Sequence, residues 1–383
     1  MYIMQTNINK VIERIIENMD TTTNVGMIIA SPSTDPPYKY HWIRDSALVM
    51  RPIIDMYINT SDPKYFQYII NYLENETKIQ NLNTISGLGE PKVNINLTPF
   101  NGSWGRPQND GPALRSIVLF KLISHLKYKY PAIINSLIVP IIVKDVEYTV
   151  KNYDKTCFDL WEEIDGWHFY TRMLQLKLIK DTIKNIDFFD FDLSILTCVE
   201  NNLSKSLKDH IYGNSIISSF DKNGEIIKYE DSANLLAFTH ISLDKDILKI
   251  IPLNCVVNTC DKLILHFRQK YNDDELNLIG RYIGDQYYDG QIWIICSLAL
   301  AQILIHIYQY NNLNKDRSPM HRSKSNPNNN YIEISNGILE RILTLDTDLI
   351  LPEQFNPNTN EYFSAKKLTW NYSELYVLIK LLN

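Results

Sequence analysis

Apolar residues return every three or four positions along most of this chain, which is the spacing that predicts helices. The pattern is clearest in Asp110–Tyr130, Pro131–Tyr153, Leu160–Ile186 and Gln291–Tyr310. It is also present in Asn7–Met19, Trp42–Tyr57, Asp62–Asn81, the stretches near 190–210, 231–242, 255–271 and 332–345, and the tail from Thr369. About a dozen helices make six helical hairpins. The pattern therefore predicts an all-α fold, an (α/α)6 barrel or toroid of six hairpins.

The length of the chain suits a ring-shaped core. An ordinary single core stops growing at about 250–300 residues, and this chain has 383. No stretch rich in Pro, Gly or Ser divides it, so we predict one domain over residues 1–383 with no linker. The Asn- and Ser-rich stretch 311–330 is predicted to be a surface loop inserted into that domain.

Composition excludes several kinds of partner and cofactor. A net charge of −6 and a pI near 5.8 leave no basic surface for a nucleic acid. The apolar run Ile292–Tyr310 is long enough to reach the ~18 residues that span a membrane. Gln302, His306 and Gln309 interrupt that run, so it is predicted to be a buried inner helix, with no membrane partner. The eight histidines form no i, i+4 pair and no Cys-x-x-Cys occurs, so we expect neither a metal nor a cofactor.

The cysteines and the first residues favour an intracellular protein. Five cysteines make an odd set without a disulfide framework: Cys157, Cys198, Cys255, Cys260 and Cys296. The first twenty residues carry Asn, Lys, Arg and Glu where a signal peptide would be apolar. Both features suit a reducing compartment. Secretion by another route is left open.

Two acidic clusters carry the candidate chemistry. Glu162 and Glu163 follow Trp161, and Glu353 lies far later in the chain. Adjacent residues of a helix point about 100° apart, so the two neighbouring glutamates do not face one atom and need a partner such as Glu353. Hydrolysis of a glycosidic bond uses an acid for the leaving oxygen and a second carboxylate that attacks the sugar or activates water. On these residues alone, a solvated helix edge is the alternative.

Five blocks of sequence occur in an order that is specific to one family. They are Ala30–Asp35 with Tyr38 and Trp42–Ser46, Gly87–Lys92 with Ser103–Arg115, Asp159–Glu163, Gly280–Tyr282 with Asp285 and Tyr287-Tyr288, and Glu353–Phe355 with Leu368–Trp370. Together these blocks resemble the glucoamylases, glycoside hydrolase family 15, from about residue 25 to residue 380. The resemblance also implies the (α/α)6 barrel. No starch-binding domain of the kind often attached to glucoamylases is expected here.

The resemblance implies a role for each matching residue. Glu162 matches the general acid, and Glu353 matches the general base that activates water, which gives inversion at the anomeric carbon. Glu163 matches a substrate-binding residue. Arg44 and Asp45 match the pair that binds the hydroxyls of the terminal sugar, so the pocket would be a dead end and cleavage exo.

Further contacts to substrate are implied for residues in the same blocks. They are Tyr38, Lys92, Trp104, Leu160 through its carbonyl, Trp161, Arg281, Trp293 and Trp370. These residue types suit a sugar, because the apolar face of a pyranose packs on indole and its hydroxyls take charged partners. Taken singly, each Trp suits a protein core equally well.

The predicted activity follows from these roles. We expect an inverting exo-acting glucoamylase that hydrolyses terminal α-1,4-linked glucose from the non-reducing ends of starch- or glycogen-type glucans and releases β-D-glucose. The expected partner is an α-glucan oligo- or polysaccharide substrate, and the protein would act as a monomer. The alternatives are a relative that cuts α-1,6 linkages or trehalose, and an inactive relative that binds glycans or regulates.

Some positions depart from the pattern of the family. They are His41, Ile283-Gly284, Ile292 and the bulky run Asp165–His168. We expect these positions to border the second sugar site and so to affect linkage preference. His168 is expected to be a hydrogen-bonded packing residue and not a catalyst.

Overall fold

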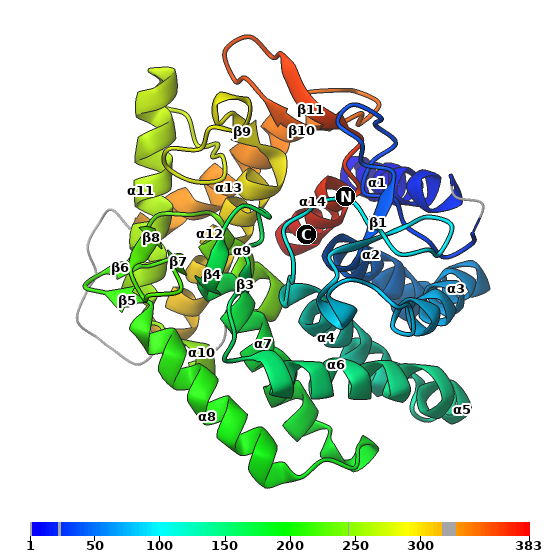
Figure 1. The fold of residues 1–383 in the computed structure, drawn as a ribbon. Coiled ribbons are helices and arrows are strands. Elements are labelled where there is room, and N and C mark those ends of the chain that lie inside the picture. The colour runs from blue at the N-terminus through cyan, green and yellow to red at the C-terminus, as the bar shows by residue number, and fades with distance from the viewer. Residues whose placement is uncertain (1, 22–23, 244, 316–326) are drawn as a thin grey trace.

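A computed structural model describes residues 2–21, 24–243, 245–315 and 327–383, and in this part of the chain the long helices form two concentric rings (Figure 1). The inner ring consists of α2 (Ile43–Thr60), α4 (Asp110–Leu126), α7 (Phe169–Lys184), α9 (Ala233–Ile241), α12 (Ile294–Lys315) and α14 (Thr369–Leu382). The outer ring consists of α1 (Tyr2–Asp20), α3 (Pro63–Ile79), α6 (Val139–Asn152), α8 (Leu193–Asp209), α11 (Leu253–Tyr271) and α13 (Pro327–Leu343).

The inner ring closes on itself. Each inner helix packs against the next one along the chain, and α14 packs against α2. Inner and outer helices alternate in sequence, so each outer helix returns the chain and the inner helices run in one direction. Within α9 every residue except Thr239 is buried, whereas the outer helix α8 buries a single stripe beginning at Leu196 and ending at Leu207. The predicted (α/α)6 barrel is confirmed.

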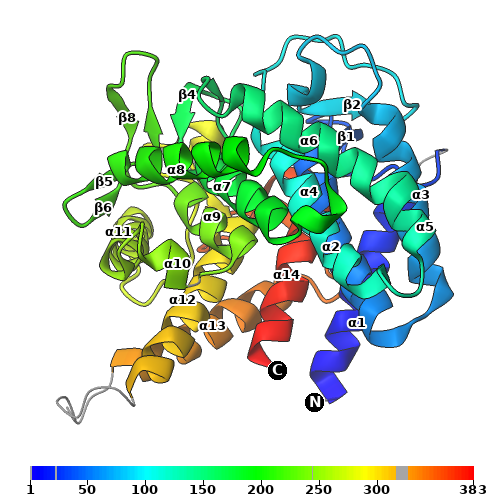
Figure 2. The same ribbon diagram turned by 90° about the horizontal axis from the view of Figure 1, so that it is seen from below.

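The chain ends meet on one side of the barrel. Figure 2 shows α1 beside α14, with both termini at the same end of the molecule. The Asn18 amide of α1 donates to Thr369 Oγ1 at 2.7 Å and to the Lys367 carbonyl at 2.9 Å, where α14 begins. The first helix of the chain therefore completes the outer layer over the last one.

Several predicted boundaries agree with the structure, and others need correction. Helix α3 begins at Pro63 as predicted, with Asp62 Oδ1 accepting from the Lys64 N–H at 2.8 Å. The predicted loop insertion 311–330 is helical at both ends, because α12 continues to Lys315 and α13 begins at Pro327. Residues 316–326 lie outside the described residues. The segment 131–152 is helical in three consecutive pieces: α5 (Pro131–Ile133), the π-turn η2 (Ile134–Ile138) and α6.

The predicted helix Leu160–Ile186 is wrong over its first nine residues. The helical segment α7 begins only at Phe169, and Glu162 and Glu163 lie in a loop between two short strands. The argument that helical geometry separates these glutamates therefore does not apply. The side chain of Asp159 accepts two backbone N–H groups of this loop, which gives the backbone an alternative to a helix.

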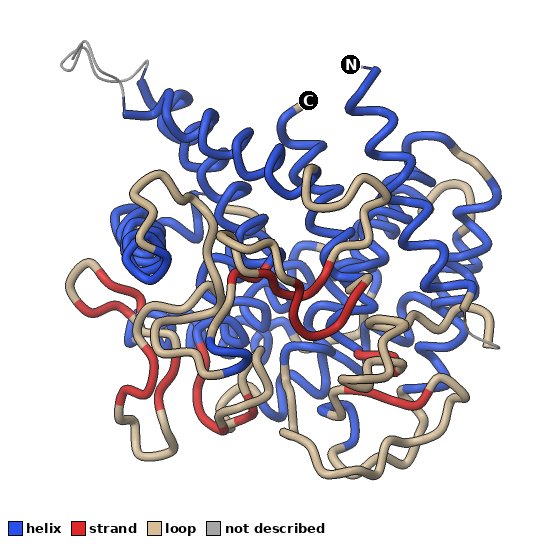
Figure 3. The backbone as a smooth tube through the Cα atoms, turned by 90° about the horizontal axis from the view of Figure 1, so that it is seen from above, coloured by secondary structure: helices blue, strands red, loops and turns tan. Residues whose placement is uncertain are grey.

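Short strands and long loops lie mostly at the end of the barrel away from both termini (Figure 3). The strands are β1 (Tyr40–Trp42), β2 (Lys92–Asn94), β3 (Cys157–Phe158), β4 (Asp165–His168), β5 (Ile211–Tyr212), β6 (Ser215–Ile216), β7 (Ser219–Phe220), β8 (Ile226–Lys228), β9 (Ile292–Trp293), β10 (Pro352–Phe355) and β11 (Tyr362–Lys366). They pair antiparallel as β1-β2, β3-β4-β7-β8, β5-β6 and β9-β10-β11. Short helical segments are η1 (Gly87–Gly89), η3 (Ile186–Phe188), α10 (Lys245–Leu248) and η4 (Tyr287–Asp289).

Helix α12 contains the most apolar stretch of the described residues. Its window Ile294–Leu313 is long and apolar enough to cross a membrane, but 72% of that window is buried inside the protein. The helix contacts α9, α13 and α14. The prediction of a buried inner helix for this segment is confirmed.

A buried carboxylate lies among the inner helices. Glu374 of α14 is fully buried and accepts hydrogen bonds from His240 Nε2 of α9 at 3.1 Å and from Gln302 Nε2 of α12 at 3.0 Å. Arg51 of α2 pairs with the same carboxylate, and Trp370 Nε1 donates to it at 2.7 Å. Burial would raise the pKa of Glu374, but Arg51 and the other donors outweigh burial and hold that pKa well below its usual value.

We predict that Glu374→Gln lowers the free energy of unfolding by about 3 kcal/mol at pH 7, because the mostly buried Arg51 loses its counter-ion. The pKa of Glu374 is lower in the folded state, so the stabilisation is present above the unfolded pKa of about 4.3 and is lost as the pH falls through the folded value. Denaturant unfolding of wild type and Glu374→Gln at pH 7 and pH 3.5 measures the difference in their free energies of unfolding. The control Glu340→Gln, at an exposed position of α13, changes stability little at either pH. Equal stability of wild type and Glu374→Gln at pH 7 would contradict the prediction.

Candidate active site

A cavity of about 470 Å³ opens at the end of the barrel where the inner helices begin. Every predicted site residue except Lys92 lines it: Tyr38, Arg44, Asp45, Trp104, Leu160, Trp161, Glu162, Glu163, Arg281, Trp293, Glu353 and Trp370. These residues come from loops, short strands and the first turns of inner helices that are far apart in sequence. The barrel therefore gathers nearly the whole predicted set into one pocket.

Glu162 lies in the six-residue loop 159–164, which joins β3 to β4 and which we call the acid loop. Asp159 holds this loop closed: its Oδ1 accepts from the Glu163 N–H at 2.7 Å and from the Ile164 N–H at 3.0 Å. Its backbone also exchanges hydrogen bonds with the loop, since the Glu162 N–H donates to the Asp159 carbonyl at 2.9 Å. Glu162 has a φ of +67°, a left-handed conformation that costs about 1–2 kcal/mol for a residue with a side chain. The hydrogen bonds that close the acid loop offset that strain, and the loop directs the Glu162 side chain into the cavity.

Four donors converge on the Glu162 carboxylate. Its Oε1 accepts from Trp42 Nε1 at 2.8 Å and Gln108 Nε2 at 3.0 Å, and Arg44 Nη2 lies 3.4 Å away. Its Oε2 accepts from Trp104 Nε1 at 2.6 Å. The carboxylate is therefore fixed at the wall of the cavity.

Glu353 reaches the cavity from the middle of β10, at a bulge in the pairing of β10 with β11. Bulges re-aim side chains and are common next to active sites. Tyr38 Oη donates to Glu353 Oε1 at 3.1 Å, and Ser364 of β11, which has a φ of +62°, donates its hydroxyl to Oε2. Burial raises the pKa of Glu353 to about 7, although the hydrogen bonds from Ser364 and Tyr38 act in the opposite direction.

Arg44 and Asp45 occupy the first turn of α2. Arg44 Nη1 pairs with Asp110 of α4 at 3.1 Å, which fixes the guanidinium between two inner helices. Its Nε lies 3.4 Å from Asp45 Oδ2, yet neither of these buried atoms makes a hydrogen bond to another described residue. Burial raises the pKa of Asp45 to about 6 despite Arg44. A buried donor and a buried acceptor that form an ion pair but no hydrogen bond suit the hydroxyl rim of a sugar.

Arg281 is held on the opposite wall. Its Nε and Nη2 bind both oxygens of Asp285 at 2.7 and 2.5 Å, and Nη2 also lies 2.8 Å from Glu163 Oε1. The guanidinium stacks near the Trp161 and Trp293 rings, 5.4 and 5.0 Å from their centroids. Together these groups form an aromatic and charged wall.

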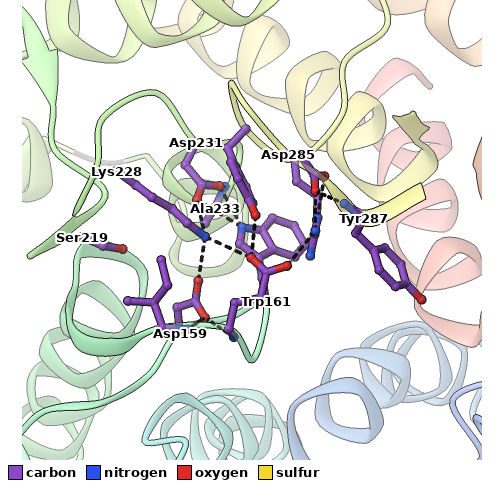
Figure 4. Close-up of polar contacts among 12 residues, drawn as sticks. Asp159, Trp161, Ser219, Lys228, Asp231, Ala233, Asp285 and Tyr287 are labelled. Carbon is purple, nitrogen blue, oxygen red and sulfur yellow. Dashed lines mark hydrogen bonds and ion pairs between the residues drawn. The ribbon is translucent and has the colours of Figure 1, made fainter. Parts of the chain in front are cut away.

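Trp161 and Trp293 use their indole nitrogens differently. Trp161 Nε1 donates to both oxygens of Asp231 at 2.9 and 3.1 Å, just before α9 begins (Figure 4). Trp293 Nε1 is buried and makes no hydrogen bond among the described residues. It is a third polar atom that could take a hydroxyl.

Lys92 does not line the cavity, and its direct contact with substrate stays a prediction. Its ammonium group is buried among aromatic rings, 3.1 Å from the Trp104 centroid and 4.2 Å from the Trp42 centroid. Burial lowers the pKa of Lys92 to about 8. Lys92 lies behind the two tryptophans that bind Glu162, so its contribution is to hold that wall.

The positions that depart from the family pattern do not line the cavity either. His41 is fully buried and points away, with Nε2 bound to Glu76 at 2.8 Å. Ile292 is buried and pairs with Phe355 within the sheet. His168 contacts Ser219 Oγ and the Cys157 carbonyl, both at 2.8 Å, which confirms the expected packing role.

Sequence reasoning did not single out some of the polar and aromatic residues of this site. Trp42 and Tyr287 line the cavity, and Gln108 and Ser364 bind the two candidate catalytic carboxylates. Trp42, Gln108 and Tyr287 belong to the matched blocks and could have been found there. Ser364 lies outside those blocks, and only the irregular pairing of β10 with β11 brings it to Glu353.

The site resembles no metal centre. Among the described residues no group of three or more His, Cys, Asp or Glu side chains is arranged to hold a metal ion. The pocket offers the separate carboxylates of Glu162 and Glu353, aromatic walls, and buried polar atoms that make no hydrogen bond to the described residues. That set suits acid–base chemistry on a neutral polyhydroxy substrate.

Comparison with known proteins agrees with this chemistry. The intracellular sporulation-specific glucoamylase of Saccharomyces cerevisiae is 29% identical over 458 residues, covering 95% of this chain and 81% of that protein. Glucoamylase S1 of Saccharomyces cerevisiae is 32% identical over 348 residues, covering 77% of this chain but only 44% of that protein. This chain therefore spans most of the first relative and less than half of the second.

Solved structures of glucoamylases are also similar to this chain. The glycoside hydrolase family 15 glucoamylase of Hypocrea jecorina superposes with a TM-score of 0.83 at 28% identity, over 94% of this chain and 67% of that one. The glucoamylase of Saccharomycopsis fibuligera has a TM-score of 0.81 at 23% identity, over 99% and 94%, which supports the fold alone. The sequence profile described as "Glycosyl hydrolases family 15" matches residues 3–380. The chain belongs to glycosyl hydrolase family 15.

Proposed function

We propose that this chain is an inverting exo-acting glucoamylase that removes single glucose units from the non-reducing ends of α-1,4-linked glucans as β-D-glucose. The observation that carries the proposal is that Glu162, from the acid loop, and Glu353, from strand β10, line one cavity, each held by its own partners. Membership of the family supports an α-glucan as the substrate.

The proposed chemistry assigns one proton transfer to each carboxylate. Glu162, at the Trp104 wall, protonates the glycosidic oxygen as the bond to the anomeric carbon breaks. Glu353 takes a proton from a water molecule that attacks the other face of the sugar, so the product has the inverted configuration. Each carboxyl group is restored when the proton gained by Glu353 returns to Glu162 through solvent.

The remaining residues bind the sugar. Arg44 Nε and Asp45 Oδ2 are the donor and the acceptor proposed for hydroxyls of the terminal glucose, beside the floor formed by Trp370. Arg281 and Glu163 are proposed to bind the next sugar. Charged partners of this kind favour the transition state when they are held rigidly, as the ion pair of Arg281 with Asp285 holds them here.

We also propose an intracellular location. All five cysteines are free thiols, four of them buried, which suits a reducing compartment. The sporulation-specific relative is described as intracellular. The monomeric state stays a prediction.

Replacing either candidate catalytic glutamate tests the mechanism. Glu162→Gln and Glu353→Gln are each expected to lower kcat on maltotriose by about 10²- to 10⁴-fold, because one proton transfer is lost. Proton NMR of the wild-type reaction should show β-glucose before mutarotation, and Glu340→Gln should behave as wild type. Early α-glucose would refute inversion. Turnover of isomaltose or trehalose but not maltotriose would favour the altered-specificity alternatives, and glycan binding without turnover would favour a binding protein.

The pH dependence separates the roles of the two glutamates. As the base, Glu353 must be ionised, so kcat/KM is expected to rise with pH through about 7. Ser364→Ala removes a hydrogen bond that lowers the pKa of Glu353, so the acidic limb should move to higher pH, and Tyr38→Phe should move it the same way. Measuring kcat/KM from pH 4 to pH 9 for wild type and both variants gives the position of the acidic limb. Movement of the alkaline limb instead would make Glu353 the acid.

A further inference from the structure

A lysine that neither motif nor periodicity singled out lies directly behind the acid loop. Lys228 is at the end of β8 and only 8% exposed. Its ammonium nitrogen is 3.0 Å from Asp159 Oδ2, 3.3 Å from Glu163 Oε2 and 4.0 Å from Asp231 Oδ2. Figure 4 shows it between Asp159 and Asp231. One buried cation thus faces three carboxylates.

Those three carboxylates each touch the candidate site. Asp159 closes the acid loop through two backbone N–H groups, and Asp231 holds the Trp161 indole. Glu163 is shared, because its Oε1 lies 2.8 Å from Arg281 and its Oε2 accepts from Tyr282 Oη at 2.6 Å as well as from Lys228. The charges therefore alternate from Asp159 through Lys228, Glu163 and Arg281.

The ionised state of the carboxylates around Lys228 depends on its charge. Without its charge, Asp159 and Asp231 would be two buried carboxylates facing each other with no cation between them, an arrangement that favours protonation or movement. Burial would raise the pKa of Asp159, but Lys228 helps to hold it below the usual range. An ionised Asp159 accepts the loop N–H groups more strongly than a neutral one.

The backbone of Lys228 is also fixed relative to the acid loop. Strands β3 and β4 flank that loop, and they belong to the same sheet as β7 and β8, in the order β3-β4-β7-β8. The Lys228 carbonyl accepts from the Ser218 N–H at 2.9 Å. The Lys228 ammonium group therefore reaches the acid loop from the same sheet that holds both ends of that loop.

We propose that Lys228 is a positioning residue for the hydrolysis: it holds Glu162 at the reacting bond through Asp159 and orients Glu163 toward the sugar. Lys228 does not line the cavity, so it acts through its neighbours and touches no substrate. This inference rests on the proposed function.

Lys228→Met keeps an unbranched side chain that is one heavy atom shorter than lysine and removes its charge. We expect kcat/KM for maltotriose to fall about 100-fold, since a displacement near 1 Å at a reacting group costs that much. Lys228→Arg should recover at least a tenth of the wild-type value. The matched control is Lys222→Met in the turn of the same hairpin, whose ammonium pairs with Asp165 and is 64% exposed. Wild-type kinetics for Lys222→Met are expected.

A double-mutant cycle separates positioning from general destabilisation. If Lys228 acts through Glu163, Lys228→Met should cost at least about fivefold less in a Glu163→Gln background than in wild type. A loss of the same size in both backgrounds would overturn the Glu163 part of the proposal. Wild-type kcat/KM in Lys228→Met would overturn all of it. Should Lys228→Met not fold, Lys228→Gln replaces it as the charge-removing variant, and wild-type kcat/KM in Lys228→Gln would refute positioning.

The same assay distinguishes the two proposals. If wild-type protein releases no glucose from any of the α-glucosides tested, the proposed function fails before Lys228 is considered. If wild type is active and Lys228→Met equals it, only the positioning role fails.

Discussion

The carboxylate of Glu374 is the interaction on which the closed inner ring depends most. It belongs to α14, and it is bound by Arg51 of α2, His240 of α9 and Gln302 of α12, so one side chain joins four of the inner helices. A buried charge is costly unless donors surround it, and here they come only from correctly placed helices. The same carboxylate holds the indole of Trp370 in the floor of the cavity. The centre of the barrel and the floor of the site are thus one polar network.

The direction of the inner helices explains why the site is at this end. Arg44 and Asp45 lie in the first turn of α2, Trp293 precedes α12 and Trp370 lies in the first turn of α14. Helix N-termini carry partial positive charge and unpaired N–H groups, which stabilise carboxylates placed beside them. Asp231 illustrates this, since its Oδ1 accepts from the Ala233 N–H at the start of α9. Loops at these termini therefore gather acidic groups in a largely apolar barrel.

The sequence predicted the barrel better than it predicted the acid loop. Apolar periodicity is set by which face of a helix is buried, so it located the helices of both rings. The helix predicted over the acid loop was wrong because the Asp159 side chain closes a loop there. Apolar periodicity carries no information about such a hydrogen bond. Matched blocks identified the lining residues, but not that Lys92 lies behind the aromatic wall. Ser364 and Lys228 reach the site only through strand pairing, which no local pattern in the sequence specifies.

The two candidate catalytic carboxylates are held by opposite physical means, and this difference supports separate roles. Glu162 is on a strained loop, where donors from Trp42, Gln108 and Trp104 surround it. Glu353 is on a strand and almost fully buried, and burial raises its pKa to about 7. This difference fits the proposed roles, with Glu162 held in place to protonate the leaving oxygen and Glu353 raised in pKa to accept a proton from water near neutral pH.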